Sequence, residues 1–300
     1  MTAATPRTVE QYLDSLRSAL EGADRALVQD ALYDAEEHLR AELAQHPGDN
    51  QGDVLASIVA SYGAPEEVAD AYRSNEKTIQ AALRTPSPRM RTSTIGRFFG
   101  VYSDPRAYLS VLYMLLALVT GTIYFTFAVT GLSMSIGLAI LIIGVPFFLL
   151  FVGATRLVAL AEGRLVETML GTRMPRRPVY PDRDTPFLRR IGEMLKDPRT
   201  WGTLVYFILM LPLGVFYFAF AVVGIMVSVV LFITPIAALL YHTGLIQIDG
   251  VVDVSHPVLL PLLSILGLLL LTVTMHLARG IGYLHGQLAK TLLVQAQSSG

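Results

Sequence analysis

The hydrophobic part of this 300-residue chain contains an internal repeat. Asp104-Pro105-Arg106 opens the first copy, and Asp197-Pro198-Arg199 opens the second. Glycines and aromatic residues recur in register with these triplets at the pairs Tyr113 and Tyr206, Gly121 and Gly214, Tyr124 and Tyr217, Phe127 and Phe220, and Gly131 and Gly224. Apolar segments share leucines by chance, but not a polar triplet together with glycines in register. The sequence therefore predicts two copies of one membrane unit.

The two copies also end alike. Arg156, Gly163, Leu165, Thr168 and Leu170 match Arg279, Gly286, Leu288, Thr291 and Leu293 once about thirty residues of the second copy are set aside. We expect this insertion near residues 242–272, where the two copies are expected to differ in function. The recurring charged residues are our candidates for the repeat interface and for coupling: Asp104, Arg106, Arg156, Asp197, Arg199 and Arg279.

Composition agrees with a membrane protein, because the hydrophobic fraction is 53% and the mean hydropathy is +0.51. The chain has no cysteine, which excludes disulfides, thiolate metal ligands and a cysteine nucleophile. No signal peptide is expected at the start, because about a hundred residues of polar, helix-forming sequence precede the first long apolar run. We expect this front part to stay in the cytosol.

Charge is distributed unevenly along the chain. Residues 1–80 carry six Lys and Arg against fifteen Asp and Glu, whereas residues 81–300 carry seventeen against nine. An acidic head thus precedes a basic membrane body. Direct binding of nucleic acid is not expected of such a head, because phosphate contacts need clustered basic residues.

The head is predicted to form four helices within residues 1–80. Thr8 and Asp24 are suited to cap the first two, each of which carries one apolar stripe. A third apolar run over residues 54–59 stops at Tyr62-Gly63. A fourth helix is expected to begin near Pro65, since proline suits a first turn and the acids that follow complement the positive helix end.

Three stretches of the head carry a resemblance to the HAAS family of signalling domains: residues 12–20 with Tyr12-Leu13-x-x-Leu16, the acidic stretch 34–39, and residues 62–69 with Tyr62-Gly63-x-Pro65. The resemblance covers about residues 8–75. It implies a small helical signalling module and a cytosolic protein partner, of which a PadR-type transcriptional regulator is one example. The acids that we expect to face this partner are Asp34, Glu36, Glu37, Glu66 and Glu67.

The same acidic stretch raises the question of a metal site. Asp34, Glu36, Glu37 and His38 place carboxylates and an imidazole at helical spacing. No second ligand cluster lies elsewhere in the head, so we interpret this stretch as a solvated helix face and predict no metal or cofactor.

Residues 81–103 are predicted to be a proline-containing linker followed by an interfacial segment around Phe98-Phe99. The first membrane repeat, residues 104–172, is long enough for two crossings, at about 108–131 and 134–157, with an uncharged turn between them. The stretch from Arg156 to Arg199 holds ten Lys and Arg against six Asp and Glu, so the positive-inside rule places it and the head in the cytoplasm.

The basic loop of residues 173–196 lies on the same predicted side as the acidic head. One hypothesis is that the head docks on this loop through Arg176, Arg177, Arg189 and Arg190. The alternative is that these arginines only fix topology and contact anionic lipid.

The second repeat, residues 197–294, contains three apolar runs at 203–224, 225–241 and 257–278. Three full crossings would leave Arg279 outside, against the charge rule and against its match with Arg156. We therefore expect residues 225–241, which contain Pro235, to form a re-entrant or interfacial segment, and the C-terminus to be cytoplasmic.

The stretch between Tyr241 and Pro257 then becomes the exterior face. Its polar residues are candidates for a ligand, a divalent cation or a response to pH: His242, Asp249, Asp253 and His256. Their spacing matches no known ligand pattern, so a plain polar loop remains the alternative reading.

The predicted spans contain no Asp or Glu. This argues against a proton-coupled transporter and against an intramembrane hydrolase, and we identify no catalytic residue. The paired aromatic residues around Tyr124 and Tyr217 are expected to pack at the repeat interface.

The membrane half resembles the sensor domain found at the front of some bacterial histidine kinases, over about residues 104–294. The motifs that carry this resemblance are the Gly-x-x-Tyr-Phe core after Leu116, Gly144-x-Pro146, the Arg156 to Arg164 helix, and Leu277-Ala278-Arg279. Few residues follow Lys290, so we expect the output to pass through the head or a separate partner rather than through an attached kinase.

Together these features predict an all-α protein: a small cytosolic helical domain followed by a duplicated polytopic membrane domain with four full crossings. We expect a signal-transducing protein of the bacterial cytoplasmic membrane that contacts lipids, with both termini in the cytoplasm. The alternative is an accessory subunit of a transporter or a small-solute carrier. Small residues such as Gly121 and Gly214 allow close helix contacts, so a homodimer is a further expectation.

Overall fold

The computed structural model describes residues 6–47, 50–83, 93–139, 143–177, 197–242 and 259–294, and every regular element in them is a helix. The chain divides into two compact units. The first contains Met1–Arg84, Gly131–Tyr206 and Gln287–Gly300, and the second contains Thr85–Thr130 and Phe207–Gly286.

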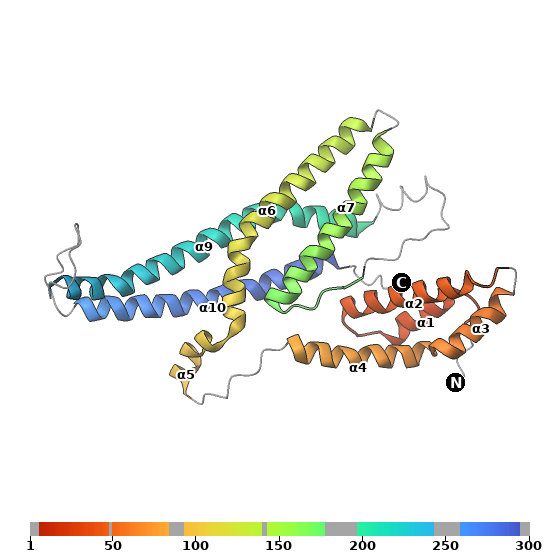
Figure 1. Cartoon of the computed structure of the whole chain (residues 1–300), viewed down its shortest axis with the longest axis horizontal. Helices are drawn as coiled ribbons and strands as arrows, with labels where there is room; N and C mark the ends of the chain where they lie inside the picture. Colours follow the sequence, from red (N-terminus) through yellow and green to blue (C-terminus); the bar gives the residue numbers. More distant parts are fainter. Residues whose placement is uncertain are drawn as a thin grey trace. The chain divides into compact units, whose positions relative to one another are not determined.

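The head consists of four helices, as the sequence predicts: α1 (Val9–Ala19), α2 (Arg25–Leu43), α3 (Gln51–Tyr62) and α4 (Pro65–Leu83) (Figure 1). Both predicted caps are confirmed. The Thr8 side chain accepts a hydrogen bond from the backbone N–H of Gln11, and the Asp24 side chain accepts one from Ala26. Such caps satisfy backbone donors that the first turn leaves without partners.

The head has a hydrophobic core of its own. Its largest fully buried side chains come from three helices: Tyr12, Leu16, Leu20, Leu39 and Leu55. The bend between α3 and α4 depends on Gly63, whose φ of +116° is rarely adopted by residues with a side chain. The Tyr12 hydroxyl donates a hydrogen bond to the Gly63 carbonyl at 3.0 Å, which ties this bend to the core.

The predicted interfacial segment forms α5 (Thr94–Phe98) and the short 3-10 helix η1 (Phe99–Ser103). Within the second unit, the Tyr102 hydroxyl lies 2.9 Å from the Thr272 hydroxyl. A ring nitrogen of His276 lies 2.9 Å from the Phe98 carbonyl. These contacts fix the segment to α10.

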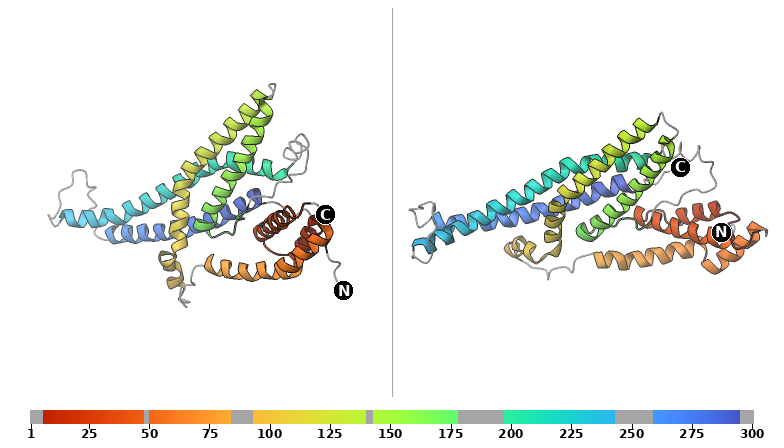
Figure 2. Two further views of the ribbon diagram at one scale, coloured as in Figure 1. Left: turned by 45° about the vertical axis from the view of Figure 1, so that its right-hand side comes forward. Right: turned by 45° about the horizontal axis from the view of Figure 1, so that its top comes forward.

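Four helices are long and apolar enough to cross a membrane: α6 (Pro105–Leu138), α7 (Gly144–Leu165), α9 (Pro198–His242) and α10 (Leu259–Leu293). A five-residue π-helix, η2 (Val166–Leu170), continues α7. Figure 1 and Figure 2 show α9 and α10 running side by side, and α7 returning alongside the end of α6. This arrangement confirms the all-α class with four apolar helices.

Two predicted boundaries in these helices are wrong. The turn expected around residues 132–135 is helical, since α6 continues to Leu138. Residues 225–241 form no separate re-entrant or interfacial segment, because α9 runs through them and through Pro235 to His242. Its 45 residues span about 67 Å, roughly twice the hydrocarbon thickness of a bilayer.

Two physical effects explain why Pro235 does not break α9. Proline removes one backbone hydrogen bond, but in apolar surroundings the remaining helical bonds have no competing water. Gly267 of α10 also lets its backbone approach residues 228–232 of α9 closely, and the Ser264 hydroxyl donates to the Phe232 carbonyl at 3.2 Å. The packed partner helix thus supports the segment that contains the proline.

The repeat is visible in how α6 and α9 meet within the second unit. A Cβ atom on Gly121 would collide with the backbone of Met210, and one on Gly214 would collide with the backbone of Ala117. Gly121 and Gly214 are equivalent in the two copies, and so are Ala117 and Met210. The helices therefore meet through reciprocal contacts that only glycine permits.

Candidate signalling interface

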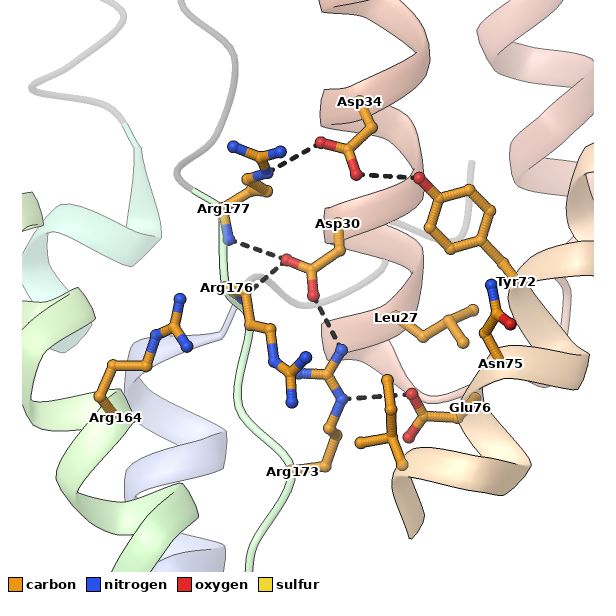
Figure 3. A pocket seen from close by; sticks show the side chains of 11 residues that line it. Leu27, Asp30, Asp34, Tyr72, Asn75, Glu76, Arg164, Arg173, Arg176 and Arg177 are labelled. Carbon is orange, nitrogen blue, oxygen red and sulfur yellow. Dashed lines mark hydrogen bonds and ion pairs between the residues drawn. The ribbon is translucent and has the colours of Figure 1, made fainter. Parts of the chain in front are cut away.

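The candidate site lies where the end of the first membrane repeat meets the head within the first unit. After η2, Gly171 adopts a φ of +70° and ends the helix. Residues 171–177, which begin with this glycine, run along the head, and we call them the connector. Figure 3 shows the connector beside α2, with the side chains of Arg173 and Arg177 directed toward acidic side chains of the head.

Arg173 is the centre of this site. Its guanidinium lies 2.9 Å from Asp30 on α2, 3.2 Å from Glu76 on α4 and 3.4 Å from Glu167 on η2. Only 8% of its side chain is exposed, so solvent screens these ion pairs little. One arginine thereby joins two head helices to the end of the membrane repeat.

The Asp30 side chain also binds backbone groups of the connector. One carboxylate oxygen accepts the N–H groups of Arg176 at 2.7 Å and Arg177 at 2.8 Å, while the other accepts from Arg173. Burial raises the pKa of the Asp30 carboxyl, and the N–H groups and the Arg173 guanidinium act in the opposite direction. Three donors from the connector thus converge on one buried carboxylate.

Arg177, the last residue of the connector, also contacts α2 of the head. Its side chain forms an ion pair with Asp34 at 2.8 Å, and its carbonyl accepts a hydrogen bond from the Gln29 side chain at 2.7 Å. Tyr72 of α4 donates its hydroxyl to Asp34 at 2.9 Å. Burial and the Asp34 carboxylate both raise the pKa of Tyr72, so this hydroxyl stays protonated as a donor.

A cavity of about 370 Å³ opens beside these groups (Figure 3). Asn75 and Ile79 of α4 contribute to its wall, together with Arg164 of α7 and residues of the ion-pair network. Arg164 is exposed, and among the described residues its side chain has no ion pair. The cavity shows that the contact between connector and head is not closely packed throughout.

The second membrane repeat also contacts the head within this unit. Lys290 near the end of α10 forms an ion pair with Asp24, the residue that caps α2. Lys290 occupies the position in the second copy that Glu167 occupies in the first. Equivalent positions at the ends of both repeats are thus used to hold the head or its connector.

Asp24 therefore has two separable roles. We expect Asp24→Asn to keep the α2 cap but to lose the ion pair with Lys290, and Asp24→Ala to lose both. The second substitution should cost about 1 kcal/mol more than the first, the typical value of a cap. The midpoint of thermal unfolding, followed by head helicity, measures this difference.

Asp70→Asn is the matched control for Asp24, because its ion pair with Arg73 is largely exposed and should contribute little. Equal effects of Asp24→Asn and Asp24→Ala would show that the cap carries no measurable stability.

Four of the charged residues predicted at the repeat interface form ion pairs, and each pair joins one copy of the repeat to the other. In the first unit Arg156 of the first copy pairs with Asp197 of the second at 3.5 Å. In the second unit Asp104 of the first copy pairs with Arg279 of the second at 2.8 Å. Arg106 and Arg199 donate their backbone N–H groups to Asp104 and Asp197.

Two buried tyrosines at equivalent positions also contact the other copy of the repeat. The Tyr206 hydroxyl donates to Glu162 at 2.7 Å in the first unit, and the Tyr113 hydroxyl lies 2.6 Å from a ring nitrogen of His285 in the second. Tyr113 and Tyr206 are equivalent, and so are Glu162 and His285. Each copy thus anchors its partner copy through the same positions with different chemistry.

The acids predicted to meet a partner lie in different environments. Asp34 is engaged by the connector, and Glu36 forms an ion pair with Arg40 at 3.2 Å. Glu67 accepts the Ala64 backbone N–H at 3.2 Å. Glu37 and Glu66 are exposed on the head. Partner binding by these residues stays a prediction.

Of the four arginines in the docking hypothesis, Arg177 pairs with Asp34 of the head through its side chain. Arg176 contacts the head through its backbone N–H, and its side chain pairs with Glu167 of η2. Arg189 and Arg190 lie outside the described residues. The same holds for Asp249, Asp253 and His256 of the predicted exterior ligand site. His242 is the last residue of α9. No group of three or more metal-ligating side chains occurs among the described residues.

Sequence reasoning missed the most buried members of the site. Asp30, Glu76, Glu162, Glu167 and Arg173 carry its ion pairs and hydrogen bonds, yet none was singled out. The signal was present for Glu162 and Glu167, since an acid in an otherwise apolar helix continuation demands a partner.

Comparison with known families decides the class of protein. A family model described as "Putative sensor" matches residues 113–293, more than half of the chain. The chain belongs to this sensor family. A second family model, HAAS, matches residues 11–71, from α1 into the first part of α4 of the head. Sensor and HAAS domains together with four apolar helices make the chain a membrane protein whose parts fit a sensor role. No curated protein and no solved structure matches the chain.

Proposed function

We propose that this sensor-family protein relays a membrane or envelope signal to a cytosolic protein partner through its HAAS head. The observation that carries the proposal is the burial of Arg173 between two head helices and the end of α7. A change in the position of α7 would act directly on this contact. The proposal places the protein in a bacterial cytoplasmic membrane with both termini in the cytoplasm.

The position of α7 depends on the second repeat. Within the first unit, α7 contacts the start of α9 through the Glu162–Tyr206 hydrogen bond and the Arg156–Asp197 ion pair. Three residues separate Glu162 from η2, which leads into the connector. A shift between the repeats therefore has a short covalent route to the head, and two states of such a helix contact are a known form of switching.

Release of the connector would expose acidic groups. Asp30, Asp34 and Glu76 would lose their arginine partners and become available to basic side chains of a partner. The exposed Glu37 and Glu66 would flank this surface from the same head. A cytosolic regulator of the PadR type is the partner class that we propose, and catalysis is not part of the proposed role.

Photo-crosslinking in native membranes tests this proposal. A photoreactive residue at Glu37 or Glu66 should capture a cytosolic regulator, and Arg173→Ala should increase the yield severalfold because the acidic face is freed. A photoreactive residue at Leu150, which is exposed on α7, is the control position and should not capture the same protein.

Two outcomes would contradict the proposal. Capture of a transport ATPase from Leu150, with no protein captured from the head, would favour the accessory-subunit role. Equal capture of the regulator before and after Arg173→Ala would show that the connector does not control the head.

A further inference from the structure

A small polar pocket lies between α7 and the first turns of α9, about one helical turn from the Glu162–Tyr206 contact. Its volume is about 10 Å³, enough for one oxygen-sized atom. Its lining is rich in hydroxyl and guanidinium groups: Val152, Thr155, Arg156, Ala159, Arg199, Thr200 and Thr203. All these residues belong to the first unit.

The pocket carries an excess of positive charge. Arg156 and Arg199 face it, and Asp197 is the carboxylate beside them. One oxygen of Asp197 lies 3.5 Å from Arg156, and the other accepts the backbone N–H of Arg199 at 3.0 Å. Among the described residues the Arg199 side chain has no ion pair. The pocket thus has two guanidinium groups and one carboxylate beside it, an arrangement that an anion would stabilise.

The hydroxyl of Thr200 points to a missing partner. Thr200 is only 7% exposed, and its buried side-chain oxygen has no hydrogen-bond partner among the described residues. A buried hydroxyl without a partner is unfavourable, because it has given up its hydrogen bonds to water. Thr200 lies in the first turn of α9, whose positive helix end also favours an anion.

The equivalent joint between the two copies, which lies in the second unit, provides an internal comparison. Ala107 and Ala278 stand at the positions equivalent to Thr200 and Thr155. There the space is filled by a hydrophobic cluster of Val101, Ala107 and Met275, and the equivalent ion pair between Asp104 and Arg279 is shorter, at 2.8 Å. The joint in the second unit is therefore built without these hydroxyls. Their presence at the joint in the first unit calls for a different explanation, and binding supplies one.

We propose that Arg156, Arg199 and Thr200 bind a phosphate group, one oxygen of which enters the pocket and accepts the Thr200 hydroxyl. The remaining phosphate oxygens lie at its mouth, where Arg199 is partly exposed and can present its planar donors. The pocket is too small for a whole phosphate but fits one of its oxygens. The inference stands independently of the signalling role, because it concerns only this pocket.

Two sources supply this chemistry: the headgroup of an anionic phospholipid and free inorganic phosphate. The pocket lies at the start of α9, one end of a membrane-crossing helix, where basic pockets meet lipid headgroups. The two sources differ in their tails and so can be separated by experiment.

The test compares the purified full chain in nanodiscs of phosphatidylcholine with and without phosphatidylglycerol, and in detergent with and without inorganic phosphate. Retained phosphatidylglycerol is counted by native mass spectrometry, and thermal stability is measured in parallel. We expect Thr200→Ala, which introduces the residue found at the equivalent position of the first copy, and Arg199→Gln each to weaken retention about tenfold, equivalent to about 1.4 kcal/mol. Arg106→Gln, the equivalent substitution in the first copy's opening triplet, is the matched control and should retain the lipid.

Each outcome decides the proposal. Loss of phosphatidylglycerol in both variants but not in Arg106→Gln supports a lipid headgroup, and stabilisation by inorganic phosphate that disappears in the same variants supports free phosphate. Three results would overturn it: no preference of the unmodified chain for either ligand over the controls, equal loss in Arg106→Gln and Arg199→Gln, or full retention in Thr200→Ala. The last would mean that water fills the pocket.

Discussion

Replacing Arg173 with methionine is expected to free the connector and to destabilise the head contact by about 3–5 kcal/mol. The substitution leaves the buried carboxylates of Asp30, Glu76 and Glu167 facing one another without the shared cation. Removing one member of a buried ion-pair network costs more than the pair contributes, because the remaining charges stay desolvated. Methionine keeps most of the volume, so the loss reports charge and hydrogen bonding rather than a cavity.

Limited trypsin digestion measures this release. The Arg176–Arg177 bond is held against Asp30 by two backbone hydrogen bonds, and cleavage there requires the connector to leave the head. We expect cleavage to become at least tenfold faster in Arg173→Met. Arg164→Met, which removes an exposed arginine beside the same cavity, should leave the rate unchanged. An unchanged rate in Arg173→Met would mean that Asp30 alone holds the connector.

The second large effect is expected at the crossing of α6 and α9. Gly121→Ala and Gly214→Ala each place a methyl group against the backbone of the facing helix, which cannot move as a side chain can. Such overpacking costs typically 1–3 kcal/mol, and more where backbone must separate. We therefore expect each variant to lower the thermal midpoint of the detergent-solubilised protein by several degrees, with the double variant lower still.

Gly153→Ala on α7 is the matched control, because a Cβ atom there meets no atom within 4 Å. Alanine also has the higher helix propensity, so this variant should be neutral or slightly more stable. Equal destabilisation by all three substitutions would contradict a specific crossing and indicate a general effect of lost glycine.

The sequence predicted most of the fold because the relevant signals are local. Thr8, Asp24 and Pro65 mark helix starts through capping and through the fixed φ of proline. The charged triplets and glycines of the repeat predicted residues that meet in space, and Asp104, Arg156, Asp197 and Arg279 do form pairs. That each ion pair joins one copy to the other could not be predicted. Aligning the copies shows which residues are equivalent, but it does not show which helices contact each other.

Two errors have the same origin. A proline and the charge rule suggested a break at residues 225–241, but the packing of Gly267 against α9 supports a continuous helix there. Arg173 looked like one more basic residue of a loop, although it is the best buried cation of the head contact. Helix continuity and burial depend on neighbours distant in sequence, and no local pattern encodes them.

The central claim is that the packing between the membrane repeats controls the contact between connector and head. Amide hydrogen exchange of residues 171–177 in the full chain tests it most directly, comparing the unmodified protein with Tyr206→Phe. Tyr206 lies on α9 and contacts Glu162 of α7, so the substitution alters only the joint between the repeats. Leu157→Ala, which changes an exposed residue of α7, is the control. We predict faster exchange at the amides of Arg176 and Arg177 in Tyr206→Phe and none of this change in Leu157→Ala, whereas equal protection in all three proteins would contradict the account.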